Sequence, residues 1–288
     1  MGNVLNDTAV FCLLARDCAA RLKKNIPVIE YYRGFFAKSY VVVVENDSRD
    51  DTNKVLEDWK GRVAGIIIDH VDSSDFSHLA RIERMSACRN AYLDAVRKLD
   101  HKPEYLIVVD ADVELQKIDL HSIIHDAPSD WAGLFADGQY YCRCFGRKIP
   151  VAYFDLFAYV PYGSSGFEFT NTQMLDNGTR ADRQLKKNEY LRCSSAFGGL
   201  GIYRYGAVED AVYQAVENTK SRLHPHLCEH LGFNRTCSSH GSLYICRSMK
   251  VLYERLSFKG CVSVFLRKTF GAGFLMKLRS RLRPGCDS

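Results

Sequence analysis

The first half of the chain alternates short apolar runs with longer segments whose apolar residues recur at helical spacing. The runs 40–44 and 105–109 are apolar throughout, which is typical of strands buried on both faces of a parallel sheet. The pattern predicts an α/β domain with a mostly parallel central sheet flanked by helices. The predicted strands are 9–15, 40–44, 64–68, 105–109 and 131–135, and the predicted helices are 19–36, 50–59 and 76–99.

The second half shows weaker periodicity. Residues 138–192 are rich in Tyr, Phe, Gly and polar side chains, which predicts loops that shape a binding site. Order is predicted to return at 196–205, with a helix at 207–217 and a strand at 243–246. The predicted subregions are 1–137, 138–246 and a basic extension at 247–288, with the first two sharing one sheet.

Composition places the chain among water-soluble folded proteins, with 47% hydrophobic and 25% charged residues. No apolar run approaches the ~20 residues that a membrane-spanning helix needs. We find no secretory signal pattern at the N-terminus. The eleven cysteines are scattered without a C-x-x-C pair, which disfavours a zinc knuckle and indicates a reducing compartment. The predicted location is the cytoplasm.

The net charge of +5 conceals an asymmetry. Residues 247–288 hold ten Lys and Arg against Glu254 and Asp287, or +8, so the rest of the chain carries −3. Apolar residues of this extension share one helical face between basic ones, namely Phe274, Leu275, Leu278 and Leu282. That pattern fits peripheral contact with an anionic membrane surface, and a solvated terminal helix or a disordered tail is the alternative. Nucleic acid is not a predicted partner, because the basic residues do not continue as a stripe over the body.

Two carboxylates end the apolar run 105–109, in the sequence Asp110-Ala111-Asp112. Residues two apart in a strand lie on the same side, so Asp110 and Asp112 are predicted to converge. They would do so at the carboxyl edge of the sheet, where open α/β folds bind ligands. Paired oxygen ligands there predict Mg²⁺ or Mn²⁺ carrying a diphosphate.

Acidic residues also follow the strand 40–44, in the turn that contains Glu45 and Asp47. Local capping explains some of them, because Asn, Asp and Ser suit turns. Glu45 stands directly at the end of a buried strand, so its charge requires a partner or a ligand. A carboxylate there is predicted to accept hydrogen bonds from a ribose or a base.

Arg89 interrupts the apolar stripe of the helix 76–99. An arginine on a buried face needs a partner because it cannot lose its charge. Two interpretations stay open: Arg89 pairs with a carboxylate of the sheet, or it holds a diphosphate.

Two later segments offer further candidates. Gly199 belongs to a cluster of three glycines in four residues, which suits close approach of a loop to a ligand. Glu229, in Cys228-Glu229-His230, is a candidate general base for an acceptor hydroxyl. His240 is a candidate metal ligand, although histidines in such polar stretches are often plain surface residues.

In family order, the Ala15-Arg16-Asp17 turn, the Glu45-Asn46-Asp47-Ser48 turn, Arg89-Asn90 and Asp110-Ala111-Asp112 resemble a GT-A-fold glycosyltransferase. The likeness covers roughly residues 8–137, and the glycine cluster and Cys228-Glu229-His230 are similar to later parts of such enzymes. Within that fold, the chain is most similar to cryptococcal-type capsular mannosyltransferases and to family-2-like transferases.

The resemblance implies a GDP- or UDP-sugar donor, with mannose favoured, and a Mn²⁺ or Mg²⁺ ion held by Asp110 and Asp112. It implies that Ala15, Glu45 and Asp47 bracket the nucleoside, and that Arg16, Ala111 and Gly199 also belong to the donor-binding residues. It further implies that Arg89 lies at the diphosphate and that a glycan or glycolipid is the acceptor.

Two alternatives are a sugar-nucleotide pyrophosphorylase and a non-catalytic peripheral membrane protein. The first would favour a glycine-rich basic loop after the first strand, which Arg16-Asp17-Cys18 is not. The second would not need acidic strand ends. A Rossmann dehydrogenase is excluded because no G-x-G-x-x-G follows the first strand.

Overall fold

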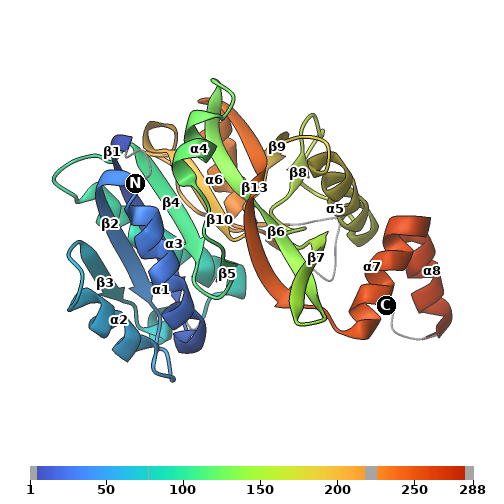
Figure 1. The fold of residues 1–288 in the computed structure, drawn as a ribbon, viewed down its shortest axis with the longest axis horizontal. Helices are drawn as coiled ribbons and strands as arrows, with labels where there is room; N and C mark the ends of the chain where they lie inside the picture. The colour runs from blue at the N-terminus through green and yellow to red at the C-terminus, as the bar shows by residue number, and fades with distance from the viewer. Residues whose placement is uncertain (1–4, 77, 218–225, 283–288) are drawn as a thin grey trace.

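One mixed sheet of eleven strands organises the described part of the chain (Figure 1). The computed structural model describes residues 5–76, 78–217 and 226–282. The strand order is β3-β2-β1-β4-β10-β6-β13-β9-β8, with β5 beside β13 and β7 beside β6. The bounds are β1 Leu5–Ala15, β2 Phe36–Glu45, β3 Ile66–His70, β4 Tyr105–Asp110, β5 Glu114–Leu115, β6 Trp131–Cys144, β7 Arg147–Tyr153, β8 Val160–Pro161, β9 Tyr190–Ser195, β10 Leu200–Arg204 and β13 Ser242–Arg255. A separate pair is formed by β11 Val216–Glu217 and β12 His226–Leu227.

Most of the long strands run in one direction. Strands β1, β2, β3 and β4 are parallel. Strand β10 is antiparallel to both β4 and β6, so β6 points the same way as β4, and β13 is parallel to β6. The carboxyl ends of β1, β2, β4, β6 and β13 therefore meet at one edge. The predicted α/β class with a mostly parallel central sheet is confirmed.

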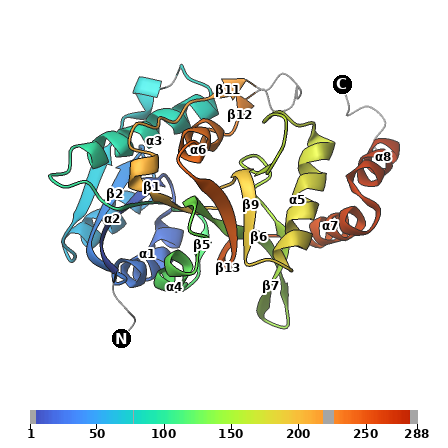
Figure 2. The same ribbon diagram turned by 90° about the horizontal axis from the view of Figure 1, so that it is seen from above.

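Helices cover both faces of this sheet (Figure 2). One hydrophobic core lies under α1 Ala19–Arg33, α2 Thr52–Lys60 and α4 Leu120–His125. A second core lies under α3 Arg81–Arg97, α5 Asn171–Leu185 and α6 His230–Ser238. The apolar runs of β1, β2 and β4 have side chains in both cores, which is why they read as continuous rather than alternating.

The elements of the first half match the sequence prediction within a few residues. The main difference is the predicted helix 76–99, which begins at Arg81 after a short 3₁₀ turn at Ser73–Phe76. The predicted helix 19–36 ends at Arg33, because Phe36 already begins β2.

Two predictions for the second half are wrong. Residues 138–192 contain the end of β6 together with β7, β8, α5 and part of β9, so they are not mainly loops. In place of the predicted helix 207–217 the structure has a 3₁₀ turn at Tyr205–Ala207, a further turn at 208–210, and an irregular stretch that leads into β11. The side chain of Asn90 accepts the N–H of Tyr213 and donates to its C=O. These two bonds take the place of the backbone hydrogen bonds that Tyr213 would make in the predicted helix.

The predicted boundary at 137/138 falls inside β6, so the two subregions are parts of one sheet. The described part of the chain ends in α7 Phe258–Phe270 and α8 Ala272–Leu282, which pack together and against α5. Among the described helices, none is both long and apolar enough to cross a membrane.

Candidate functional site

A cavity of about 850 Å³ opens at the carboxyl edge of β1, β2 and β4. Seven of the residues predicted from the sequence line it: Ala15, Arg16, Arg89, Asp110, Ala111, Asp112 and Glu229. They come from β1, the N-terminal half of α3, the end of β4 and the segment before α6. Side chains far apart in sequence therefore share one wall; Arg89 and Glu229, for example, are 140 positions apart and are hydrogen-bonded.

Asp110 and Asp112 stand where β4 leaves the buried interior. Residues 105–109 are all buried, whereas the Asp110 side chain is 27% exposed and Asp112 is exposed. The Asp110 N–H donates to the carbonyl of Gly199 at 3.0 Å, which fixes the strand end. Among the described residues, no hydrogen-bond or ion-pair partner is found for the Asp112 carboxylate, which faces the cavity.

Arg89 joins two of the carboxylates. Its side chain is 2% exposed, its Nε donates to Glu229 at 2.9 Å, and an Nη donates to Asp110 at 3.0 Å. Its other Nη lies 3.3 Å from the hydroxyl of Tyr92. Of the two interpretations of Arg89, the structure shows the pairing with a sheet carboxylate, and the pair lines the cavity. Contact of Arg89 with a diphosphate stays a prediction.

Negative charge is in excess around this arginine. Burial raises the pKa of Asp110 to about 7, with Asp112 adding to the rise and Arg89 opposing it. No group of three or more metal-ligating side chains is found in the described residues. Mg²⁺ and Mn²⁺ commonly use one or two carboxylates plus substrate phosphates. Asp110 and the unpaired Asp112 fit that arrangement, and they do not form a cage made of protein ligands alone.

His230 lies beside Glu229 and is 2% exposed. Its ring stacks on Phe197 with centroids 3.9 Å apart, and in the described structure neither ring nitrogen has a hydrogen-bond partner. Burial and then the charge of Arg89 hold the pKa of His230 well below its usual value, so the ring is neutral. Unpaired buried nitrogens at a cavity wall indicate that a water or a ligand group completes them.

Asp155 is a cavity residue that sequence reasoning missed. Its carboxylate accepts the N–H of Gly198 at 2.7 Å and that of Ala158 at 3.3 Å. Burial raises its pKa to about 6, although the two N–H donors oppose the rise. Gly198 has φ +69°, and a Cβ there would lie 2.1 Å from the carbonyl oxygen of Ala136, so only glycine can present this N–H.

Two arginines of α3 were also missed. Arg81 and Arg84 line the cavity, and neither has a hydrogen-bond or ion-pair partner among the described residues. They occupy the first turn of α3, three residues apart and on the side that leads to Cys88 and Arg89. The spacing of three residues puts both arginines on one face of the helix. Because the helix was predicted to begin at residue 76, the sequence did not place them in its first turn.

Three aromatic side chains form an aromatic wall of the cavity. Phe154 and Tyr253 stack with centroids 4.3 Å apart, and Tyr140 meets both rings edge-on. All three line the cavity, and they come from β6, β13 and the loop after β7. No sequence motif marks this wall, because the three segments meet only in the folded sheet.

Glu45 and Asp47 do not line the cavity, contrary to prediction. Glu45 is 2% exposed, and its carboxylate turns inward to accept the N–H of Ser48 and to contact His70. Asp47 lies exposed in the turn with φ +45°. The partner that the buried charge of Glu45 requires is therefore supplied by the turn itself and by His70. The polar side chain that lines the cavity at this strand end is Asn46.

Gly199 and His240 are also placed differently from the prediction. Gly199 lies behind the cavity, where its carbonyl supports Asp110 and a Cβ would lie 2.9 Å from Val113. His240 lies at the opposite edge of the sheet, since it precedes Ser242, which pairs with Trp131 at the start of β6. His240 is therefore not a metal ligand beside Asp110.

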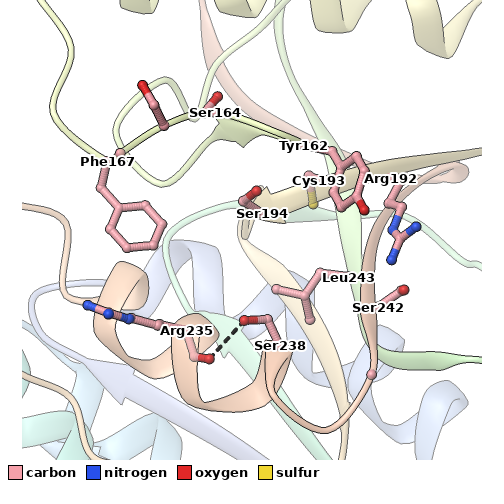
Figure 3. A pocket seen from close by; sticks show the side chains of 13 residues that line it. Tyr162, Ser164, Phe167, Arg192, Cys193, Ser194, Arg235, Ser238, Ser242 and Leu243 are labelled. Atoms are coloured by element: carbon pink, nitrogen blue, oxygen red, sulfur yellow. Dashed lines mark hydrogen bonds between the residues drawn. The ribbon is translucent and has the colours of Figure 1, made fainter.

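A second cavity, of about 520 Å³, lies near His240 (Figure 3). Arg235 and Arg192 stand on opposite sides of it, with Ser194 and Ser238 between them. Arg192 stacks over Tyr162 at 4.1 Å. Both arginines are exposed, and none of the residues predicted from the sequence lines this cavity.

No protein-family model and no curated protein matches this chain. Solved structures that it resembles include TarS 1–349 of S. aureus, with 16% identity over 98% of this chain and TM-score 0.47. The mannosyltransferase PcManGT of Pyrobaculum calidifontis, in complex with GDP-Man and Mn²⁺, shows 12% identity over 96% of the chain and TM-score 0.49. GalNAc-T7 with UDP, GalNAc and Mn²⁺ shows 11% identity over 90% and TM-score 0.48.

This chain spans 66%, 65% and 47% of the lengths of those three structures. The likeness is distant at such identities.

Proposed function

We propose that this protein is a metal-dependent glycosyltransferase that moves a sugar from a nucleoside-diphosphate sugar to a hydroxyl of a glycan or glycolipid acceptor. The observation that carries the proposal is the paired strand-end carboxylates Asp110 and Asp112, one of them unpartnered among the described residues, in a cavity rimmed by arginines. The glycine-free turn Arg16-Asp17-Cys18 disfavours a pyrophosphorylase, and a non-catalytic membrane protein would not need paired carboxylates at a strand end.

The cavity divides into a donor side and an acceptor side. Arg16, Arg81 and Arg84 supply positive charge for a diphosphate, while Ala15 and Asn46 line the side available to a nucleoside. Asp110 and Asp112 would hold the ion, which when bound supplies Lewis-acid stabilisation of the leaving diphosphate. The flat faces of Phe154 and Tyr253 suit the apolar face of a sugar ring.

Asp155 is the carboxylate best suited to accept the acceptor's proton. In the transfer step the acceptor oxygen bonds to the anomeric carbon while the bond from that carbon to the diphosphate oxygen breaks. The electron pair leaves with the nucleoside diphosphate, and Asp155 takes the hydroxyl proton. A base with a pKa of about 6 is matched to this task near neutral pH.

Glu229, the base predicted from the sequence, has a different task in this proposal. One of its oxygens already accepts the Nε–H of Arg89 at 2.9 Å, and its side chain is 2% exposed. We assign Glu229 to holding Arg89, which in turn orients Asp110. The donor sugar is expected to be mannose, from GDP-mannose, on the resemblance to capsular mannosyltransferases, with UDP-sugars as the next choice.

The test measures nucleotide binding and slow donor hydrolysis. With Mn²⁺ present, GDP or UDP at about 100 times its dissociation constant is expected to raise the melting temperature by roughly 5–10 °C. GDP-mannose, UDP-glucose and UDP-GlcNAc are then screened for metal-dependent release of nucleoside diphosphate. No stabilisation and no hydrolysis would overturn the transferase proposal. Release of nucleoside triphosphate on adding pyrophosphate would instead support a pyrophosphorylase.

Asp155→Asn is expected to lower turnover about 10²–10⁴-fold and to raise stability near neutral pH. The folded pKa of about 6 exceeds the unfolded value, so ionisation of Asp155 costs stability as the pH rises from about 4 to 6. Asparagine avoids that cost, which predicts a gain on the order of 1 kcal/mol near pH 7 that vanishes near pH 4. Denaturant unfolding at several pH values measures the gain.

The matched control for this variant is Asp176→Asn. The Asp176 carboxylate accepts the N–H of Ala272, and Asp176 does not line the cavity. The control should leave turnover unchanged. Wild-type turnover in Asp155→Asn would exclude Asp155 as the base while leaving the transferase proposal intact.

A further inference from the structure

Helix α7 leaves large apolar side chains on the surface. Phe258 is 84% exposed, Phe265 is 65% exposed and Val262 is 40% exposed. Their spacing of four and three residues places them on one face of the helix. Scattered apolar surface residues are ordinary, but a row of this kind on one helix face indicates a contact surface.

The β6–β7 hairpin presents a second exposed aromatic residue. Phe145 is fully exposed at its tip, where Phe145 and Gly146 have φ +48° and +77°. Exposed Arg143 and Arg147 flank the tip. A Cβ on Gly146 would have no neighbour within 4 Å, so the tip projects freely from the body.

The hairpin and α7 adjoin each other. Arg255 at the end of β13 pairs with Tyr141 of β6, and the N–H of Leu256 donates to the Tyr141 carbonyl at 2.8 Å. The chain then enters α7 at Phe258, and Figure 1 shows both features at the same lower edge of the molecule. We call this surface the basic–aromatic edge, comprising Arg143, Phe145, Arg147, Arg255, Phe258, Lys259, Val262 and Phe265.

Charge on this edge is one-sided. Its four basic residues are exposed, and within residues 143–149 and 254–265 Glu254 is the single acidic residue. Phenylalanines on a protruding tip and on a helix face, set among basic side chains, match the headgroup region of an anionic bilayer. We propose that the basic–aromatic edge docks this protein peripherally on an anionic lipid membrane.

This surface differs from the one that the sequence suggested. Leu275 of the predicted apolar face of α8 is 5% exposed, because α8 packs on α5 and α7. Phe274 of α8 is 47% exposed, but the aromatic side chains with the highest exposed fractions lie on α7 and on the hairpin. The proposed membrane contact therefore moves from the terminal helix to the edge where β6 and β13 end.

The edge also lies on the side of the sheet that bears the cavity. Strands β4, β6 and β13 run in the same direction, and β6 and β13 supply Tyr140 and Tyr253 to the cavity wall before they reach the edge. If the proposed transfer holds, an acceptor carried on a membrane lipid would meet the cavity from this side.

The test is vesicle flotation without any nucleotide, so that it is independent of the transferase proposal. Wild-type protein is expected to float with phosphatidylcholine vesicles that contain phosphatidylserine, and to be released by salt. The double variant Phe145→Ser/Phe258→Ser should reduce the bound-to-free ratio at least about 10-fold. Arg143→Glu/Arg147→Glu should abolish the preference for phosphatidylserine.

The control is Tyr162→Ser, which removes a 60% exposed aromatic side chain beside the second cavity. It should float as wild type does. All these side chains are exposed, so melting temperatures should stay unchanged. Wild-type protein that fails to float, or equal flotation of the Phe145/Phe258 variant, would overturn the proposal. A dimer in size-exclusion chromatography that depends on these two phenylalanines would instead identify a protein interface.

Discussion

Replacing Asp112 with alanine is expected to reduce metal-dependent turnover of the sugar nucleotide at least about 10³-fold while the melting temperature stays unchanged. The Asp112 side chain is exposed to the cavity, and no partner for its carboxylate is found in the described structure, so folding does not depend on it. The ion that neutralises the leaving diphosphate would keep only one protein carboxylate, Asp110. Turnover is measured as release of nucleoside diphosphate, with Mn²⁺ titrated against each protein.

Asp100→Ala is the matched control, because Asp100 is exposed in the turn after α3 and does not line the cavity. It should match wild type in both turnover and Mn²⁺ dependence. Full turnover by Asp112→Ala would remove the carboxylate pair from the mechanism. Loss of the folded state would show that Asp112 has a structural role that the geometry does not indicate.

Arg89→Met is expected to destabilise the protein by about 3–5 kcal/mol, which lowers the melting temperature on the order of 10 °C. The substitution leaves Glu229 buried without its 2.9 Å partner, and it also removes the charge beside Asp110. Removing one member of a buried ion pair costs more than the pair contributes, because the remaining charge is unsolvated. Denaturant unfolding and calorimetry measure the loss.

Arg84→Met provides the comparison on the same helix, because Arg84 lines the cavity without a partner among the described residues. It should change stability by no more than about 0.5 kcal/mol and should weaken nucleotide binding. Adding Glu229→Gln to Arg89→Met should recover part of the stability, since the unpaired charge is then gone. Equal stability of Arg89→Met and wild type would contradict the buried network.

Local patterning was sufficient to predict the strands and helices of residues 1–137. The runs in β1, β2 and β4 predicted their strands because both faces are buried, and Arg89 drew attention because a charge interrupts an apolar stripe. Residues 138–192 were misread because β6, β7 and α5 mix apolar side chains with glycines and polar groups that are satisfied only by tertiary partners. Asp182, for example, accepts the N–H of Tyr153 and so joins α5 to β7.

Closeness in sequence did not predict which residues lie together at the cavity. His240 follows Glu229 by eleven positions, yet the nine residues of α6 carry the chain about 13 Å toward the other edge. Asp155 and Gly198 lie 43 positions apart and share a hydrogen bond. Glu45 ends a buried strand beside the cavity, but the N–H of Ser48 three residues later already binds its carboxylate.

The sequence by itself determined the α/β class, the position of Asp110 and Asp112 at a strand end, and the burial of Arg89. These features follow from periodicity and from the cost of burying a charge, which act over a few residues. Only the tertiary structure decided that Glu229 holds Arg89, that Asp155 faces the cavity, and that Phe145 and Phe258 share one exposed edge. Those relations depend on strand register and on the path of helices between strands, which no local pattern encodes.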